Sequence, residues 1–127
     1  MDGSIYTGVE SNIMTTAGKD KWGPRAWRAL HVTAVDYAAQ PTRAEKAAAY
    51  SWLWRFARAL PCGECRAHAT AYIGQYPPDL AGSRELQNWA WRFHNAVNAR
   101  LKKPLMTAEE YANTYRDDLN KKYREYL

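Results

Sequence analysis

One stretch of the chain decides the fold: residues 83–101, SRELQNWAWRFHNAVNARL. Its apolar residues recur at the i, i+3, i+4 and i+7 spacing of a helix that buries one face. They are Leu86, Trp89, Ala90, Phe93, Val97 and Leu101. We expect Ser83 to cap this helix, because a serine hydroxyl can accept from an early amide, and Pro104 to close it, because proline cannot continue a helix.

Helical signals continue on both sides of this stretch. Gly23-Pro24 places a proline at the first position of an expected helix, which repeats apolar residues from Trp27 onward. Capping boxes begin at Thr42 and at Thr107. Pro61 forces the residue before it out of the helical region and ends the second helix. The expected helices therefore cover residues 23–38, 42–60, 62–76, 83–103 and, as a shorter or frayed segment, 107–127.

Length and composition indicate one domain. The chain has 127 residues, of which 46% are hydrophobic and 24% charged, the ordinary proportions of a globular protein. No segment alternates in the manner of a strand. We therefore predict an all-α fold, a four-helix bundle with a short additional C-terminal helix. The expected division is a flexible N-terminal extension (1–20), the domain (21–118) and a C-terminal helical tail (119–127).

Hydropathy and charge indicate whether the protein binds a membrane or nucleic acid. The longest apolar run, residues 47–54, is far shorter than the roughly 18 residues of a membrane span, so no membrane partner is expected. The first twenty residues lack a secretory signal, and we expect a cytoplasmic protein. A net charge of +5 leaves open a basic helical module that binds nucleic acid or a scaffold. The basic residues are scattered, however, so no nucleic acid is expected.

The chain has only two cysteines, Cys62 and Cys65, in the sequence Cys-Gly-Glu-Cys. So short a loop constrains little of the unfolded chain, and the pair is therefore no structural staple. At a helix N-terminus, unpaired amides and the helix dipole favour a thiolate, which suits a dithiol redox couple. Half a zinc site and a buried pair of reduced thiols are the alternatives, and we expect no metal. A thioredoxin-like setting is not expected, because no strand precedes the motif.

A dithiol needs a redox cofactor to pass electrons to oxygen, and the sequence has no Gly-rich phosphate loop. The segment 94–98, HNAVN, offers polar side chains beside the apolar stripe, and Arg100 and Lys103 follow it. His94 and Asn98 share one helix face at i, i+4 spacing. A satisfied core histidine flanked by solvated bases is the alternative interpretation of this segment.

Taken together, three segments resemble the Erv/Alr family of FAD-linked sulfhydryl oxidases, which includes the augmenter of liver regeneration. They are residues 22–31 (WGPRAWRALH), 60–65 (LPCGEC) and 94–104 (HNAVNARLKKP). The resemblance implies a helical bundle that holds FAD in its mouth, usually as a homodimer. The two cysteines, the basic character and the Trp-Gly-Pro start look most like compact members encoded by large cytoplasmic DNA viruses. Such a member would work in the host cytoplasm and could enter the virion.

The resemblance also implies roles for individual residues. Cys62 is attacked by the substrate thiolate, and Cys65 is the sulfur next to the flavin, which passes electrons to oxygen and gives hydrogen peroxide. The implied activity is that of an FAD-dependent thiol oxidase that forms disulfides in protein dithiols, such as a small protein with its own Cys-x-x-Cys. The expected cofactor-binding residues are Gly23, Trp27, His31, Cys65, Trp91, His94, Asn95, Val97, Asn98, Arg100, Lys103 and Tyr115.

Two features of most cellular relatives are missing from this sequence. Neither a shuttle disulfide nor a structural disulfide can form, because both cysteines belong to the redox pair. Ile73 and Trp91 stand where the structural pair would align, and we expect them to fill that space by packing. Without a shuttle, the partner must bring its dithiol directly to Cys62.

Overall fold

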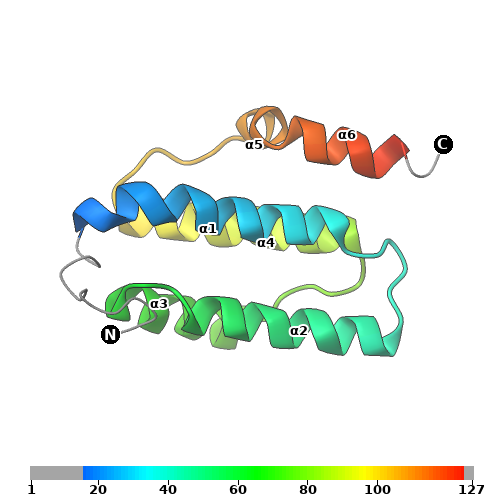
Figure 1. Cartoon of the computed structure of the whole chain (residues 1–127), viewed down its shortest axis with the longest axis horizontal. Coiled ribbons are helices and arrows are strands. Elements are labelled where there is room, and N and C mark those ends of the chain that lie inside the picture. Colours follow the sequence, from blue (N-terminus) through cyan, green and yellow to red (C-terminus); the bar gives the residue numbers. More distant parts are fainter. Residues whose placement is uncertain (1–15, 125–127) are drawn as a thin grey trace.

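The computed structural model describes residues 16–124, which form six helices and no strand. Figure 1 shows α1 and α4 together in one layer, α2 and α3 in a second layer, and α5 and α6 on the opposite side of the first. The all-α prediction of a four-helix bundle with helical structure after it is confirmed. The helices are α1 (Thr16–Asp36), α2 (Arg43–Arg58), α3 (Gly63–Gln75), α4 (Ser83–Arg100), α5 (Ala108–Thr114) and α6 (Arg116–Arg124).

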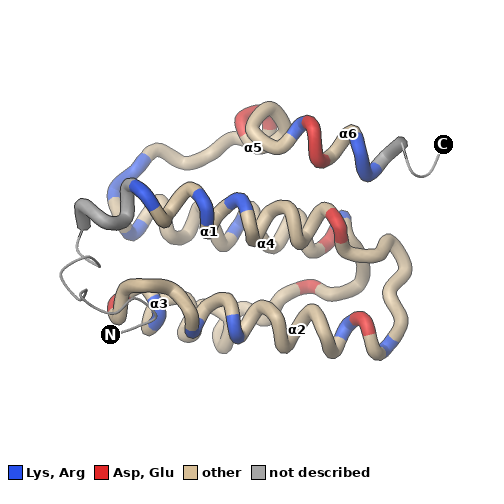
Figure 2. The backbone as a smooth tube through the Cα atoms, viewed as in Figure 1, with Lys and Arg blue, Asp and Glu red and all other residues tan. Residues whose placement is uncertain are grey.

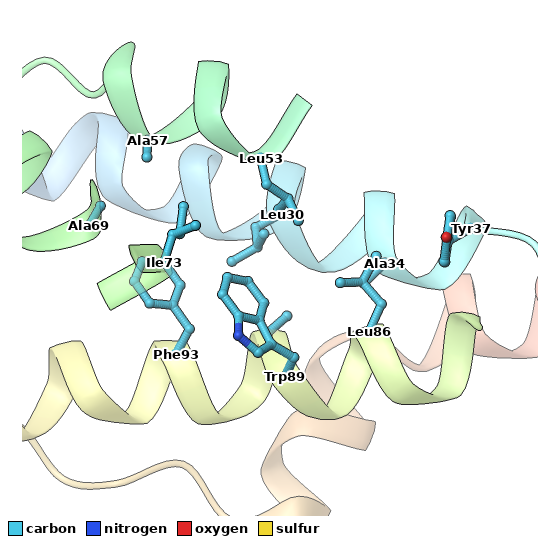
Figure 3. Close-up of a cluster of buried hydrophobic side chains, with 11 residues drawn as sticks. Leu30, Ala34, Tyr37, Leu53, Ala57, Ala69, Ile73, Leu86, Trp89 and Phe93 are labelled. Atoms are coloured by element: carbon cyan, nitrogen blue, oxygen red, sulfur yellow. The ribbon is translucent and has the colours of Figure 1, made fainter. Parts of the chain in front are cut away.

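The core lies between the two layers and is built by the apolar stripe of α4 (Figure 3). Leu86, Trp89 and Phe93 each expose less than 5% of their surface. Leu30 of α1 and Leu53 of α2 close the core from the other helices. The smaller members of the cluster, which let the helices approach one another, are Ala34, Ala57, Ala69 and Ala90.

The predicted start of the first helix at Gly23-Pro24 is wrong. α1 begins at Thr16, and Pro24 lies inside it. A proline inside a helix removes one backbone hydrogen bond. Trp22, which precedes the proline, lines the same pocket as Trp27, so tertiary packing holds the helix together on both sides of Pro24. The expected extension at residues 1–20 is therefore helical from residue 16, and its first fifteen residues lie outside the described part of the chain.

Ser83 does not cap α4. The N-cap is Gly82, and Ser83 is the first helical residue. The Ser83 hydroxyl lies 2.8 Å from the carbonyl oxygen of Ala34 and 3.0 Å from that of Val35, both in the last turn of α1. Gly82 is required here by a close approach, because a Cβ on it would lie 2.5 Å from the carbonyl oxygen of Ala39. The start of α4 is therefore joined to the end of α1.

The C-terminal segment forms two short helices. The capping box at Thr107 is confirmed and starts α5, with the Thr107 hydroxyl accepting from the amide of Glu110. The helix ends at Thr114, Tyr115 is its C-cap, and α6 begins at Arg116. The expected boundary at residue 118 therefore falls inside α6. An ion pair of 2.9 Å between Arg28 and Asp118 joins α6 to α1.

Charged residues are distributed over all the helices, as Figure 2 shows. Lys and Arg segments are interspersed with Asp and Glu and with long uncharged stretches. Within residues 16–124, no helix combines the length and the apolar character needed to cross a bilayer.

Candidate active site

The cysteine pair lies at the beginning of α3. Cys62 has an extended backbone and is the N-cap of this helix, and Cys65 lies in its first turn. The amide of Cys65 donates to the sulfur of Cys62 at 3.3 Å. Both residues are 9% exposed, so a partner can reach them only through a small opening. The sequence-based placement of the pair at a helix N-terminus is confirmed.

Charged neighbours fix this turn to the rest of the bundle. Arg66 donates to the carbonyl oxygen of Leu60 at 2.7 Å, which ties α3 back to the end of α2. Glu64 lies 3.8 Å from Arg100 at the C-terminus of α4. Because Glu64 is largely exposed, this ion pair contributes little stability. It nevertheless places Arg100 beside the Cys-Gly-Glu-Cys turn.

Cys65 lines a pocket at this end of the molecule, where both helix layers meet. The cavity has a volume of about 90 Å³ and is bounded mainly by aromatic and aliphatic side chains. Arg100 and Lys103 are the cationic residues in its wall. Its lining residues are Trp22, Gly23, Ala26, Trp27, Phe56, Leu60, Cys65, His68, Ala69, Phe93, Val97, Arg100, Leu101 and Lys103. Cys62 is not among them.

A stack of rings extends from Trp27 in the pocket wall, through His94 and His31, to the tyrosines of the α5 segment. Trp27 stacks on His94, with ring centroids 3.7 Å apart and planes within 8° of parallel. His94 Nδ1 lies 2.9 Å from Nε2 of His31, so one of these nitrogens donates and the other accepts. Tyr115 packs against His31 with a centroid distance of 4.5 Å. Tyr111 meets the same ring edge-on at 5.3 Å.

Burial keeps both histidines neutral. Desolvation, reinforced by the neighbouring His94, lowers the pKa of His31 to about 3. Desolvation also lowers the pKa of His94 to about 4, with a further contribution from the positive charge of Lys103. The buried Nδ1 of His31 and Nε1 of Trp22 have no hydrogen-bond partner. Of these two atoms, the Trp22 nitrogen belongs to a residue of the pocket wall and is available to a ligand there.

The structure brings together only part of the predicted cofactor-binding set. Gly23, Trp27, Cys65, Val97, Arg100 and Lys103 line the pocket. His31, His94 and Tyr115 form the ring stack behind Trp27.

Three predicted residues lie away from the pocket wall. Asn95 and Trp91 both bind the backbone of Met106. Asn98 accepts the amide of Lys103 with its backbone carbonyl. Ile73 is buried in the core, whereas Trp91 is outside the core cluster, so their expected mutual packing stays a prediction.

Eight residues that line the pocket were not predicted from the sequence. For five of them the sequence does carry a pattern that could have indicated the position. Trp22 belongs to the Trp-Gly-Pro start, and Phe93 and Leu101 continue the apolar stripe of α4. Phe56 and Leu60 share a face by i, i+4 spacing on α2. Ala26, His68 and Ala69 carried no signal. Across residues 16–124, no three His, Cys, Asp or Glu side chains are grouped so as to hold a metal ion.

Comparison with known proteins gives a consistent result. Residues 24–116 match the sequence model of the Erv1 / Alr family. An "FAD-linked sulfhydryl oxidase" of African swine fever virus (isolate Pig/Kenya/KEN-50/1950) is 41% identical over 100 residues, which cover 79% of this chain and 84% of that protein.

Solved structures of yeast Erv1 are similar as well. The crystal structure of the yeast Erv1 core has a TM-score of 0.74 and 30% identity, covering 92% of this chain and 96% of that chain. The FAD binding domain of Erv1 from Saccharomyces cerevisiae has a TM-score of 0.72 and 30% identity, covering 78% and 94%. With the redox pair, the aromatic pocket and the bundle all in place, the chain belongs to the Erv1/Alr family.

Proposed function

We propose that the protein is an FAD-dependent thiol oxidase, which forms disulfides in protein substrates through Cys62 and Cys65. One observation carries this proposal: Cys65 lies in the wall of an aromatic pocket, one helical turn from a second cysteine that is outside the wall. Such an arrangement separates the sulfur that meets the cofactor from the sulfur that meets the substrate. Membership of the Erv1/Alr family supports the same activity.

The pocket fits a flavin cofactor on its own chemistry. Trp22 and Trp27 supply flat apolar surfaces for a ring system. The unpartnered Nε1 of Trp22 offers a donor to a ring carbonyl or a phosphate oxygen. Arg100 and Lys103 supply positive charge for a pyrophosphate, so no Gly-rich loop is needed. FAD, when bound, would accept two electrons from the cysteine pair and deliver them to oxygen, giving hydrogen peroxide.

The protein's own sulfurs carry out two exchange steps. A substrate thiolate attacks Cys62 of the oxidised pair, which breaks the bond between Cys62 and Cys65 and releases the Cys65 thiolate. The second substrate thiol then attacks the mixed disulfide, which releases Cys62 and completes the substrate disulfide. Two electrons and two protons have left the substrate. The pair now holds both electrons, with Cys65 lining the pocket.

The helix start assists these steps. The amide of Cys65 faces the sulfur of Cys62, and helix N-termini stabilise a negatively charged sulfur. This favours the displacement that frees Cys62 at the end of the second step. Glu64 and Arg100 place one charge of each sign beside this turn, and the Arg66 guanidinium lies next to Gly63 in the same turn, so positive charge predominates around the cysteines.

Absorption spectra of two matched variants test the proposal. We expect the purified protein to show the spectrum of an oxidised flavin. Cys62→Ser leaves a Cys65 thiolate in the pocket, so a long-wavelength charge-transfer band should appear. Cys65→Ser places an oxygen there, and the band should be absent. Both variants should lose thiol oxidase turnover, measured as oxygen consumption with a reduced dithiol.

Each contrary result has its own meaning. A colourless protein that cannot be loaded with FAD would overturn the cofactor. Equal spectra for the two variants would overturn the assignment of roles to the two sulfurs. A nucleic-acid absorbance peak that persists in the purified protein would favour the basic binding module, for which the scattered charges give no support.

The partners are part of the proposal. We infer that the substrate is a small protein with its own Cys-x-x-Cys, because the chain has no further cysteine to relay electrons. Oxygen is the proposed electron acceptor. The functional unit is proposed to be a homodimer that works in a virus-infected cytoplasm and enters the virion; the likeness to a viral protein supports the infected-cell setting.

A further inference from the structure

The loop between α4 and α5, residues 101–107, forms one side of the pocket. Leu101 and Lys103 line the cavity, and the whole run 102–105, which includes Lys103, is exposed to solvent. An exposed loop with few apolar contacts opens easily unless its backbone is held. The position of Lys103 therefore depends on what holds the two ends of this loop.

The upstream end is held by a Schellman turn. The amide of Lys103 donates to the carbonyl of Asn98 at 2.8 Å, and that of Lys102 donates to the carbonyl of Ala99 at 3.1 Å. Lys102 has a φ of 59° and occupies the left-handed position that glycine usually takes. This turn reverses the chain at the end of α4, so that Lys103 follows directly at the pocket.

The downstream end is held by two side chains of α4 at Met106. Asn95 Oδ1 accepts the amide of Met106 at 2.7 Å, and its Nδ2 donates to the carbonyl of the same residue at 2.9 Å. The indole nitrogen of Trp91 donates to that carbonyl at 2.9 Å. All three hydrogen bonds meet on one backbone unit. We call Asn95, Trp91 and the Met106 backbone the Met106 clasp.

The positive charge of Lys103 acts electrostatically on His94, which is part of the ring stack. This charge contributes to the lowered pKa of His94. Because Lys103 also lines the cavity, one side chain contributes charge both to the pocket wall and to the stack of Trp27 and His94. The pocket wall is where an anionic group of a bound cofactor would need a cation.

We propose that Asn95 is a positioning residue that acts through the Met106 clasp to hold Lys103 at the pocket for the cofactor pyrophosphate. Both polar ends of the Asn95 side chain are engaged by Met106, so its contribution to cofactor binding is indirect. The inference rests on the proposed FAD site. It gives Asn95 and Trp91 a role different from the direct contact that the family resemblance implies.

A double-mutant cycle tests the proposal in the cofactor-free protein, titrated with FAD and monitored by quenching of flavin fluorescence. Asn95→Ala and Lys103→Met should each weaken FAD binding about 10-fold, the effect expected for one lost charge-assisted contact. The double variant should be about 10-fold weaker as well, because Lys103 is already displaced when the clasp is broken. Asn88→Ala, an exposed substitution on the same helix, is the matched control and should bind FAD normally.

A second measurement follows the clasp without FAD. Hydrogen exchange of the Met106 amide should accelerate about 10-fold in Asn95→Ala, which loses its acceptor, and not in Asn88→Ala. Trp91→Phe keeps an aromatic ring and removes one donor to Met106. This variant should weaken FAD binding by about 3-fold. If Asn95→Ala does not fold, Trp91→Phe is used in its place.

The outcomes separate the two proposals. A wild-type protein that does not bind FAD would overturn the proposed function, and the inference with it. Normal FAD binding by the wild type with effects that multiply, about 100-fold in the double variant, would overturn the inference alone and assign Asn95 a direct contact. Unchanged Met106 exchange in both Asn95→Ala and Trp91→Phe would also overturn it.

Discussion

At the scale of single residues, the contact between His31 and His94 depends on both rings staying neutral. Nε2 of His31 and Nδ1 of His94 are 2.9 Å apart, so protonation would place two N–H groups against each other. The groups that face the pair are the rings of Trp27, Tyr111 and Tyr115. The positive charge of Lys103 acts on His94 in the same direction as burial.

Protonation of this pair should therefore destabilise the fold in acid. The pKa values in the folded protein, about 3 and about 4, lie below the 6.5 of an unfolded histidine. The unfolded chain then binds more protons as the pH falls below 6.5, so stability falls with it until about pH 4 for His94 and about pH 3 for His31. We expect a loss of roughly 2 kcal/mol at pH 5 for each histidine that stays neutral. Thermal unfolding at pH 8, 6 and 5 measures it.

Two variants locate the source of this acid sensitivity. The double variant His31→Phe/His94→Phe removes both titrations and should have a much flatter dependence of Tm on pH. His68→Phe changes an exposed histidine of α3 and should keep the wild-type dependence. If the double variant retained the wild-type dependence, the histidine pair would not be its cause.

The sequence predicted the surroundings of a residue correctly where its neighbours along the chain determine them. Cys62 and Cys65 had to lie at the start of a helix, because Pro61 ends the preceding one. The hydrogen-bond partner of Asn95 could not be predicted in this way. The place of Asn95 on α4 was predictable, but its partner, the Met106 backbone, depends on the path of a loop that has no periodic signal.

At the scale of elements, the end of α4 carries a strained residue. Lys102 has a φ of 59°, where a non-glycine residue costs about 1–2 kcal/mol. Lys102→Gly removes this strain but raises the entropy of the unfolded chain, which costs about 0.4–1 kcal/mol. The strain is the larger of the two, so we expect stabilisation by up to about 1 kcal/mol, seen as a higher urea midpoint.

Lys46→Gly is the matched control for that substitution. Lys46 is exposed in α2 and has ordinary helical geometry, so the same change should cost about 1 kcal/mol. A lower urea midpoint for Lys102→Gly would mean that the lysine side chain contributes more than its backbone strain costs.

The helix boundaries show which sequence signals are sufficient to predict where a helix starts or ends. Both capping boxes predicted their helix starts, because the threonine and the glutamate satisfy backbone groups locally. The start of α1 was missed, because the helix continues through Pro24, with Trp22 and Trp27 packed in the pocket wall on either side of it. The break between α5 and α6 falls at Tyr115, inside the segment 107–127 that the sequence predicts as one shorter or frayed helix. Tyr115, the residue at the break, is buried against His31, so this position is fixed by a tertiary contact that has no local signal in the sequence.

At the scale of the whole molecule, a substrate protein has to reach two cysteines that are almost completely buried. Both cysteines are only 9% exposed, and the chain has no third cysteine. A dithiol protein that fits this opening should therefore be oxidised much faster than glutathione, by about 100-fold or more in kcat/KM if preorganised contacts supply roughly 3 kcal/mol. Oxygen consumption with a reduced Cys-x-x-Cys protein and with glutathione measures the ratio.

A trapping variant gives this prediction its control. Cys65→Ala leaves Cys62 without its resolving partner, so a mixed disulfide with the partner protein should accumulate. Cys62→Ala should trap nothing, because the sulfur proposed to meet the substrate is gone. Equal kcat/KM for the protein and for glutathione, with no trapped adduct, would identify a small-molecule thiol oxidase.

The pocket draws its wall from both helix layers: Trp27 and Phe93 come from the pair α1 and α4, and Phe56 and Cys65 from the part of the chain that forms α2 and α3. A ligand held there joins the two halves and binds only when they are assembled. Such a ligand adds about 2.7 kcal/mol to folding at a concentration 100 times its Kd. Since proteases act mainly on unfolded chains, the flavin supply of the cell would then govern how long each copy of the protein survives.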